Sequence, residues 1–127
     1  MKACPLHHIH HYCTNLEETI AFWRDGFGVP FVRYRKFGED SGAEMDMGNG
    51  VLFFAVQCCS ESRALSKPIC GLDHLGMQVP DIDAALKHLT SIPGVRVGRE
   101  PFMSESLRCA FVIGPDEVRV ELIETPR

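Results

Sequence analysis

The first half of the chain alternates between strand-like and helix-like spacing of apolar residues. An alternating stretch at 6–13 leads to Asn15, a typical helix cap with Glu18 three residues later. Large apolar residues then recur at helical spacing, at Leu16, Ile20, Trp23 and Phe27. Three further strand-like stretches lie at 31–37, 43–47 and 51–57. This half therefore predicts one strand, one helix ended by Gly26 and Gly28, and three more strands, the last two joined by a tight Asn49-Gly50 turn.

The second half repeats this order of elements. A strand-like stretch at 72–79 leads to Asp81, which caps a helix with apolar residues at helical spacing, namely Ile82, Ala85, Leu86 and Leu89. A short strand at 95–99, an irregular loop or weak strand at 100–107, and a hairpin of 108–113 and 117–124 complete it. His74 stands 66 residues after His8, as Asp81 does after Asn15. A fixed offset of this kind indicates an internal repeat.

These patterns predict an α+β fold of two tandem βαβββ modules, whose curved mixed sheets form a cup. We expect a single domain over 1–127, with module one at 5–57, a linker at 58–70 and module two at 71–125. The linker is expected where serine and proline interrupt the periodicity.

Composition narrows the class of protein. The 127 residues are 45% hydrophobic, which is enough for a packed core, and the net charge is −4 with scattered basic residues, so a nucleic-acid partner is disfavoured. No apolar run approaches the ~20 residues that cross a bilayer, and 1–5 lack the apolar core of a signal peptide. We expect a cytoplasmic protein, with no membrane partner, whose six cysteines are reduced thiols.

Three residues from distant stretches form a candidate metal site. Glu121 lies on a strand among apolar neighbours, where a carboxylate needs a cation or strong donors. If the modules are related by a pseudo-two-fold axis, His8 and His74 open equivalent strands and converge with Glu121. Two imidazoles and one carboxylate suit a divalent Fe, Mn, Ni, Co or Zn ion and leave positions open for substrate.

Other polar residues have two interpretations each. His10 faces the same way as His8, so it is either a proton carrier or a hydrogen-bonded residue of the cup. Glu44 and Asp46 belong either to a solvated face or to the substrate side as a base. Arginines on the strands either bind an anionic substrate or cover a wet sheet face; these are Arg33, Arg35 and Arg108.

The remaining histidines and the large aromatic residues are expected to be structural. The histidines are His7, His11 and His88. The aromatic core set is Trp23, Phe27, Phe53, Phe54 and Phe111.

Three motifs together resemble the vicinal oxygen chelate superfamily. They are the repeated entry at 8–15 and 74–81, the Phe-Trp-Arg-Asp-Gly-Phe-Gly run at 22–28, and the closing segment at 114–123. That superfamily includes glyoxalase I, methylmalonyl-CoA epimerase, extradiol dioxygenases, fosfomycin resistance proteins and metal-free bleomycin resistance proteins. The resemblance implies that His8, His74 and Glu121 are metal ligands. It also implies a homodimer, which in some members exchanges halves.

The chain departs from the superfamily pattern at one position. Members resembling glyoxalase I take a fourth ligand, Glu or Gln, from the last strand of the first half. Laying that strand against the closing hairpin puts Phe53 or Ala55 there, with Gln57 further along as a substitute. A three-ligand set is similar to that of fosfomycin transferases and extradiol dioxygenases, and Ser104-Glu105 is similar to a loop of the former.

The leading hypothesis is a metal-dependent lyase or isomerase, glyoxalase-like or epimerase-like, acting on a small molecule. The ion chelates vicinal oxygens and stabilises an oxyanion, with Glu121 and His10 as the expected catalytic residues. The alternatives are an extradiol-type dioxygenase or a fosfomycin-type thiol transferase with the same site. The non-enzymatic alternative is a metal-free drug-sequestering protein.

Overall fold

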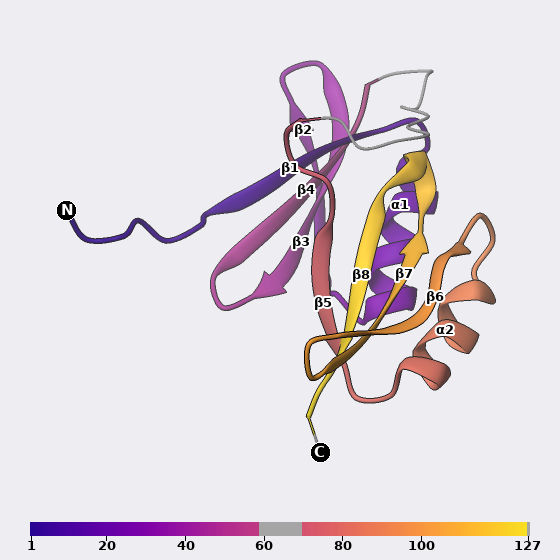
Figure 1. The fold of residues 1–127 in the computed structure, drawn as a ribbon. Helices are drawn as coiled ribbons and strands as arrows, with labels where there is room; N and C mark the ends of the chain where they lie inside the picture. Colours follow the sequence, from indigo (N-terminus) through magenta and orange to yellow (C-terminus); the bar gives the residue numbers. More distant parts are fainter. Residues whose placement is uncertain (59–69, 127) are drawn as a thin grey trace. The chain divides into compact units, whose positions relative to one another are not determined.

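The computed structural model describes residues 1–58 and 70–126, so the expected linker lies almost wholly outside the described residues. The chain forms two compact units, Met1–Ser62 and Arg63–Arg127, which we call module one and module two (Figure 1). Among the described residues, no helix is both long enough and apolar enough to span a membrane.

Module one is a four-stranded mixed sheet with one helical segment. Its elements are β1 (His8–Cys13), α1 (Leu16–Ala21), a π-helical turn η1 (Phe22–Gly26), β2 (Phe31–Phe37), β3 (Asp40–Gly48) and β4 (Val51–Gln57). The strand order is β1-β4-β3-β2, with β1 parallel to β4 and the other pairs antiparallel. The tight turn after β3 has positive φ at Asn49 (53°) and Gly50 (80°), as its Asn-Gly sequence predicts.

Module two repeats this topology. Its elements are β5 (Leu75–Val79), α2 (Ile82–Thr90), β6 (Arg96–Ser104), β7 (Leu107–Ile113), a 3₁₀ turn η2 (Pro115–Glu117) and β8 (Arg119–Glu124). The strand order is β5-β8-β7-β6, with β5 parallel to β8 (Figure 1). The predicted fold class of two tandem βαβββ modules is confirmed.

The structure corrects several predicted boundaries. β6 continues through 100–104 of the stretch expected to be an irregular loop or a weak strand, because register shifts around Arg99 and Phe102 accommodate Pro101, which cannot donate to a ladder. β5 begins at Leu75 rather than residue 72, which leaves His74 immediately before the strand. The first helix changes to a π turn at Phe22, and both Phe22 and the adjacent Trp23 are fully buried there.

The end of the last strand in each module is hydrogen-bonded to the start of the helix. In module one, Gln57 Oε1 accepts from Leu16 N (2.8 Å), and Gln57 Nε2 donates to the carbonyl of Thr14. In module two, Glu124 Oε2 accepts from Ile82 N (2.9 Å). These bonds satisfy backbone donors that every helix start leaves open, in addition to the caps from the preceding residues.

The helix of each module covers one face of its sheet, and we call the other face the open face. In module one, Trp23 packs on Phe53 with ring centroids 5.1 Å apart, so Phe53 belongs to the helix-covered core as predicted. In module two, buried residues of α2 and β8 form this core, including Ile82, Leu89, Val120 and Leu122. Because strand side chains alternate, residues next to these on β4 and β8 lie on the open face.

We expect Gln57→Ala to lower the stability of the protein by about 1–2 kcal/mol, because it removes a helix-capping acceptor that is partly buried. Differential scanning calorimetry should show a fall in Tm of several degrees. Gln78→Ala, which changes an exposed glutamine of β5, is the control and should leave Tm within about a degree. Equal Tm values for the two variants would contradict the capping role.

Candidate metal-binding site

Strand pairing places a row of four open-face residues across each sheet. In module one, the register brings His10 on β1, Phe54 on β4, Glu44 on β3 and Arg33 on β2 into this row. In module two, the same pairing positions hold Gly76 on β5, Glu121 on β8, Phe111 on β7 and Arg99 on β6. The two rows therefore give residue-by-residue correspondence between the modules.

This correspondence corrects the predicted counterpart of Glu121. The counterpart is Phe54, because Phe54 pairs with His10 as Glu121 pairs with Gly76, and not Phe53 or Ala55. The offset between modules is 66 residues up to β6 but 67 beyond it, since the bulge at Pro101 adds a residue. Glu44 corresponds in turn to Phe111, so a carboxylate and a phenyl ring have exchanged strands between the modules.

His74 and Glu121 lie together in module two. His74 Nε2 is 3.4 Å from Glu121 Oε1, and both side chains are partly exposed. Two ligands at about 2.1 Å from one ion, at angles of about 90–110°, are separated by roughly 3.0–3.4 Å. The pair is therefore spaced as two ligands of one ion would be, and wider apart than a typical hydrogen bond.

The other ring nitrogen of His74 is bound by a carboxylate. Nδ1 lies 2.8 Å from Asp73 Oδ2, and Arg119 Nη1 donates to the same oxygen. The hydrogen bond with His74, assisted by the Arg119 charge, holds the pKa of the Asp73 carboxyl below its usual value. Because an ionised carboxylate only accepts, Nδ1 donates the proton of this hydrogen bond, and Nε2 is the ring nitrogen that faces Glu121.

His8 has a similar neighbour in module one. Its Nδ1 lies 2.9 Å from Nδ1 of His7, one ring donating to the other, and its ring packs on Phe54 with centroids 4.7 Å apart. His7 precedes His8 as Asp73 precedes His74, and the 66-residue offset equates the two. Within the described residues, no three metal-binding side chains are already grouped, and the meeting of His8 with the His74–Glu121 pair stays a prediction.

His10 lies on the open face of module one in an aromatic cluster. Its ring centroid is 4.9 Å from that of Tyr12, 5.5 Å from Phe37 and 6.3 Å from Phe54. Phe37 lies over Gly42, where an added Cβ would be 2.6 Å from its ring. Phe54, predicted to be ordinary core, is instead buried within this cluster on the open face.

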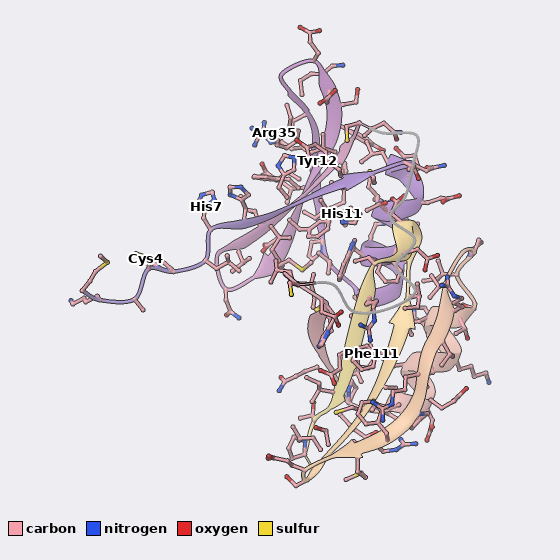
Figure 2. The ribbon with its side chains drawn as sticks, turned by 45° about the horizontal axis from the view of Figure 1, so that its top comes forward. Cys4, His7, His11, Tyr12, Arg35 and Phe111 are labelled. Atoms are coloured by element: carbon pink, nitrogen blue, oxygen red, sulfur yellow. The ribbon has the colours of Figure 1, made fainter. Side chains whose placement is uncertain are left out.

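The two arginines on β2 of module one share the carboxylate of Glu44. Glu44 Oε1 is 3.1 Å from Arg35 and 3.5 Å from Arg33, and its side chain is only 13% exposed, so it is not simply solvated. The Arg35 guanidinium also lies 4.4 Å above the Phe37 ring, and Figure 2 shows Arg35 on the same module as Tyr12. Asp46 accepts from the backbone N–H of Gly48 and so holds the turn.

Two residues considered for the site have other roles. Arg108 pairs with Asp83 of α2 and with Glu124, so it ties the sheet to the helix. Gln57 uses both amide atoms at the start of α1 and lies on the opposite strand face from Phe54, which removes it from the predicted ligand positions. Sequence reasoning missed Asp73, although its position directly before the repeated histidine could have identified it as a partner of that ring.

Two of the described cysteines are buried, and one of them, Cys109, lies beside Glu121. Cys13 and Cys109 are buried, whereas Cys4, Cys58 and Cys70 are exposed. Burial, together with the nearby Glu121 carboxylate, raises the pKa of the Cys109 thiol. A raised thiol pKa disfavours the nucleophilic thiolate, so Cys109 acts as packing beside Glu121.

A family comparison identifies the class of protein. The model of the Glyoxalase/Bleomycin resistance protein/Dioxygenase superfamily matches residues 7–105. The chain therefore belongs to this superfamily, as its motifs suggested. A search of curated protein sequences finds no match.

Solved structures with the same fold include enzymes and binding proteins. A glyoxalase family protein from Enterococcus faecalis has a TM-score of 0.76 at 20% identity, with 94% of this chain and 97% of that chain covered. TnmS3, an antibiotic binding protein from Streptomyces sp. CB03234, has 0.72 at 17%, covering 99% of each. The fosfomycin resistance protein FosX from Listeria monocytogenes has 0.72 at 16%, covering 100% and 94%. At these identities the similarity establishes the fold.

We expect the neutral ring of His74 to favour the Nδ1–H tautomer in metal-free protein, because Asp73 accepts from that nitrogen. Long-range ¹H–¹⁵N NMR of the imidazole ring reports the tautomer directly. Asp73→Ala should abolish this preference while leaving the His88 signals unchanged. An unchanged His74 tautomer in the variant would show that Asp73 does not orient the ring.

Proposed function

We propose that this protein is a metal-dependent enzyme of the superfamily, in which His8, His74 and Glu121 hold one divalent ion. The observation that carries the proposal is the 3.4 Å separation of His74 Nε2 and Glu121 Oε1, with Asp73 binding the opposite ring nitrogen. A carboxylate on the far nitrogen is the usual support of a metal-binding histidine, since it fixes the ring and raises its basicity. The suitable ions are Ni(II), Co(II), Mn(II), Fe(II) and Zn(II).

The replacement of a fourth ligand by Phe54 favours a three-residue ligand set. Phenylalanine supplies no donor atom, and its ring instead packs on His8 and limits that side chain's orientation. Three protein ligands leave open positions for two vicinal oxygens of a small substrate. When bound, the ion supplies a Lewis acid that stabilises negative charge on those oxygens.

Other residues of the chain would orient the metal ligands and transfer the proton. Asp73 and Arg119 orient His74, and the exposed ring of His10 lies on the open face where it can accept or donate a proton. Glu121 acts as a metal ligand, and its negative charge also changes the electrostatics of the site. We propose lyase or isomerase chemistry, in which a proton moves next to the chelated oxygens. The same ligand set also supports an extradiol-type dioxygenase or a fosfomycin-type thiol transferase.

The second candidate function is metal-free ligand sequestration. The observation that favours it is the aromatic cluster of module one, where His10, Tyr12, Phe37 and Phe54 present ring surfaces on the open face. Such surfaces suit the stacking of flat ligands. The fold of TnmS3, an antibiotic binding protein, is consistent with this alternative.

We further propose a homodimer, with exchanged modules as one arrangement, and a cytoplasmic location.

We expect chelator-treated protein to take up about one Mn(II), Co(II), Ni(II) or Zn(II) per chain in calorimetric titration, with a rise in Tm on binding. His8→Ala, His74→Ala and Glu121→Gln should each weaken binding by at least about tenfold, because each removes a ligand. His88→Ala and Glu100→Gln, which change surface residues of module two, are the matched controls. No stoichiometric binding, or equal affinity in ligand variants and controls, would favour the sequestering protein.

Metal-loaded protein should catalyse exchange of the α-protons of hydroxyacetone with deuterium, since lyase and isomerase chemistry begins with removal of such a proton. Proton NMR in deuterated water measures the rate. His10→Gln should lower it by about 10²-fold or more while retaining metal affinity, with His88→Gln as the control. Oxygen uptake with catechol and Fe(II), without deuterium exchange, would instead assign dioxygenase chemistry.

A further inference from the structure

One arginine on the open face of module two has no carboxylate partner among the described residues. Of the seven arginines that the structure describes, six pair with a carboxylate within 4 Å, and Arg99 is the one that does not. Arg99 is exposed on β6. An unpaired guanidinium near a candidate active site is available to bind an anionic group of a ligand.

The exchange of side chains between the modules explains why Arg99 is unpaired. Arg33 occupies the corresponding place in module one, where it pairs across the strands with Glu44 and lies 3.5 Å from its carboxylate. Arg99 pairs across the strands with Phe111 instead. In module two the carboxylate of this row lies on β8, as Glu121, and not on β7. Glu121 thus supplies the candidate metal site, and Arg99 has no anion on the neighbouring strand.

Aromatic rings connect Arg99 to His74. The Arg99 guanidinium carbon lies 3.6 Å above the Phe102 ring, which is a close cation–π contact. Phe102 is stacked on Phe111 at 6.0 Å with an interplanar angle of 4°, and the Phe111 centroid is 5.0 Å from that of His74. Figure 2 marks Phe111, the middle of this series. The stack fixes the cation on the same open face as the ligand pair.

The other arginines of this module are already engaged. Arg119 binds Asp73, Arg96 pairs with Glu117 at 2.6 Å, and Arg108 pairs with Asp83 and Glu124. On the open face of module two, the two negative charges of Asp73 and Glu121 match the two positive charges of Arg119 and Arg99. A divalent ion would therefore leave a surplus positive charge that an anionic substrate neutralises.

We propose that Arg99 is a specificity-determining residue that binds a carboxylate or phosphate of the substrate while its vicinal oxygens reach the ion. This inference rests on the proposed metal-dependent function and adds the substrate class, a small chelating molecule with a further anionic group. A guanidinium fork fits the paired oxygens of either anion. The stacked phenylalanines occupy the space between the two contacts with apolar surface.

Hydroxamates separate the two contacts, because the hydroxamate chelates metal through vicinal oxygens while a chain extension carries the anion. We would measure affinities of Mn(II)-loaded protein for acetohydroxamate and for hydroxamates extended by two to four methylene groups ending in carboxylate or phosphonate. At least one extended probe should bind about tenfold more tightly than acetohydroxamate. The tighter of the carboxylate and phosphonate series then names the preferred anion.

Arg99→Met should abolish this preference and leave acetohydroxamate and Mn(II) affinities unchanged, whereas Arg99→Lys should retain part of it. Arg96→Met, on the same strand, is the matched control and should behave as wild type. Absence of a preference, or its persistence in Arg99→Met, would overturn the inference while metal-dependent acetohydroxamate binding upheld the proposed function. Failure of the protein to bind Mn(II) or any hydroxamate would overturn both.

Discussion

The strand register around β4 and β8 is the constraint on which the candidate site depends. Each of these strands is paired on both sides, and its residues alternate between the helix-covered face and the open face. A slip of one residue would put Glu121 into the helix-covered core and Val120 or Leu122 in its place. Gln57 and Glu124 oppose such a slip, because each reaches a helix start only from its present position.

The same register gives the two modules unequal chemistry on equivalent scaffolds. In module one, Phe54 stands at the ligand position, and Glu44 is shared by two arginines beside an aromatic surface. In module two, Glu121 faces His74, and Phe111 has no charge to offer Arg99. A single exchange of side-chain types between neighbouring strands therefore places the carboxylate beside a histidine in module two and beside two arginines in module one.

Much of this architecture could be predicted from the residues. The helix-cap spacing and the repeated histidine predicted two βαβββ modules, and the strand expected at 117–124 predicted that Glu121 lies on the last strand. The exact counterpart of Glu121 could not be predicted, since the extra residue at the Pro101 bulge appears only in the pairing. The turns agree with the corrected offset, because Asn49 and Asp116 both have positive φ. The partners of Arg99 and His74 could not be predicted either, because they depend on side-chain packing, about which hydrophobic periodicity carries no information.

The support of His74 follows from its place just before β5. Outside the ladder, the histidine is not held by strand hydrogen bonds, so its orientation depends on Asp73 and on the Phe111 ring beside it. Asp73 is itself held by Arg119, which lies on β8 two residues from Glu121 and stacks over Phe111 at 4.8 Å. The carboxylate that faces His74 and the cation that orients it through Asp73 thus project from one strand. Their relative position is fixed by that strand's backbone, and this accounts for a defined His74–Glu121 geometry at an otherwise exposed segment.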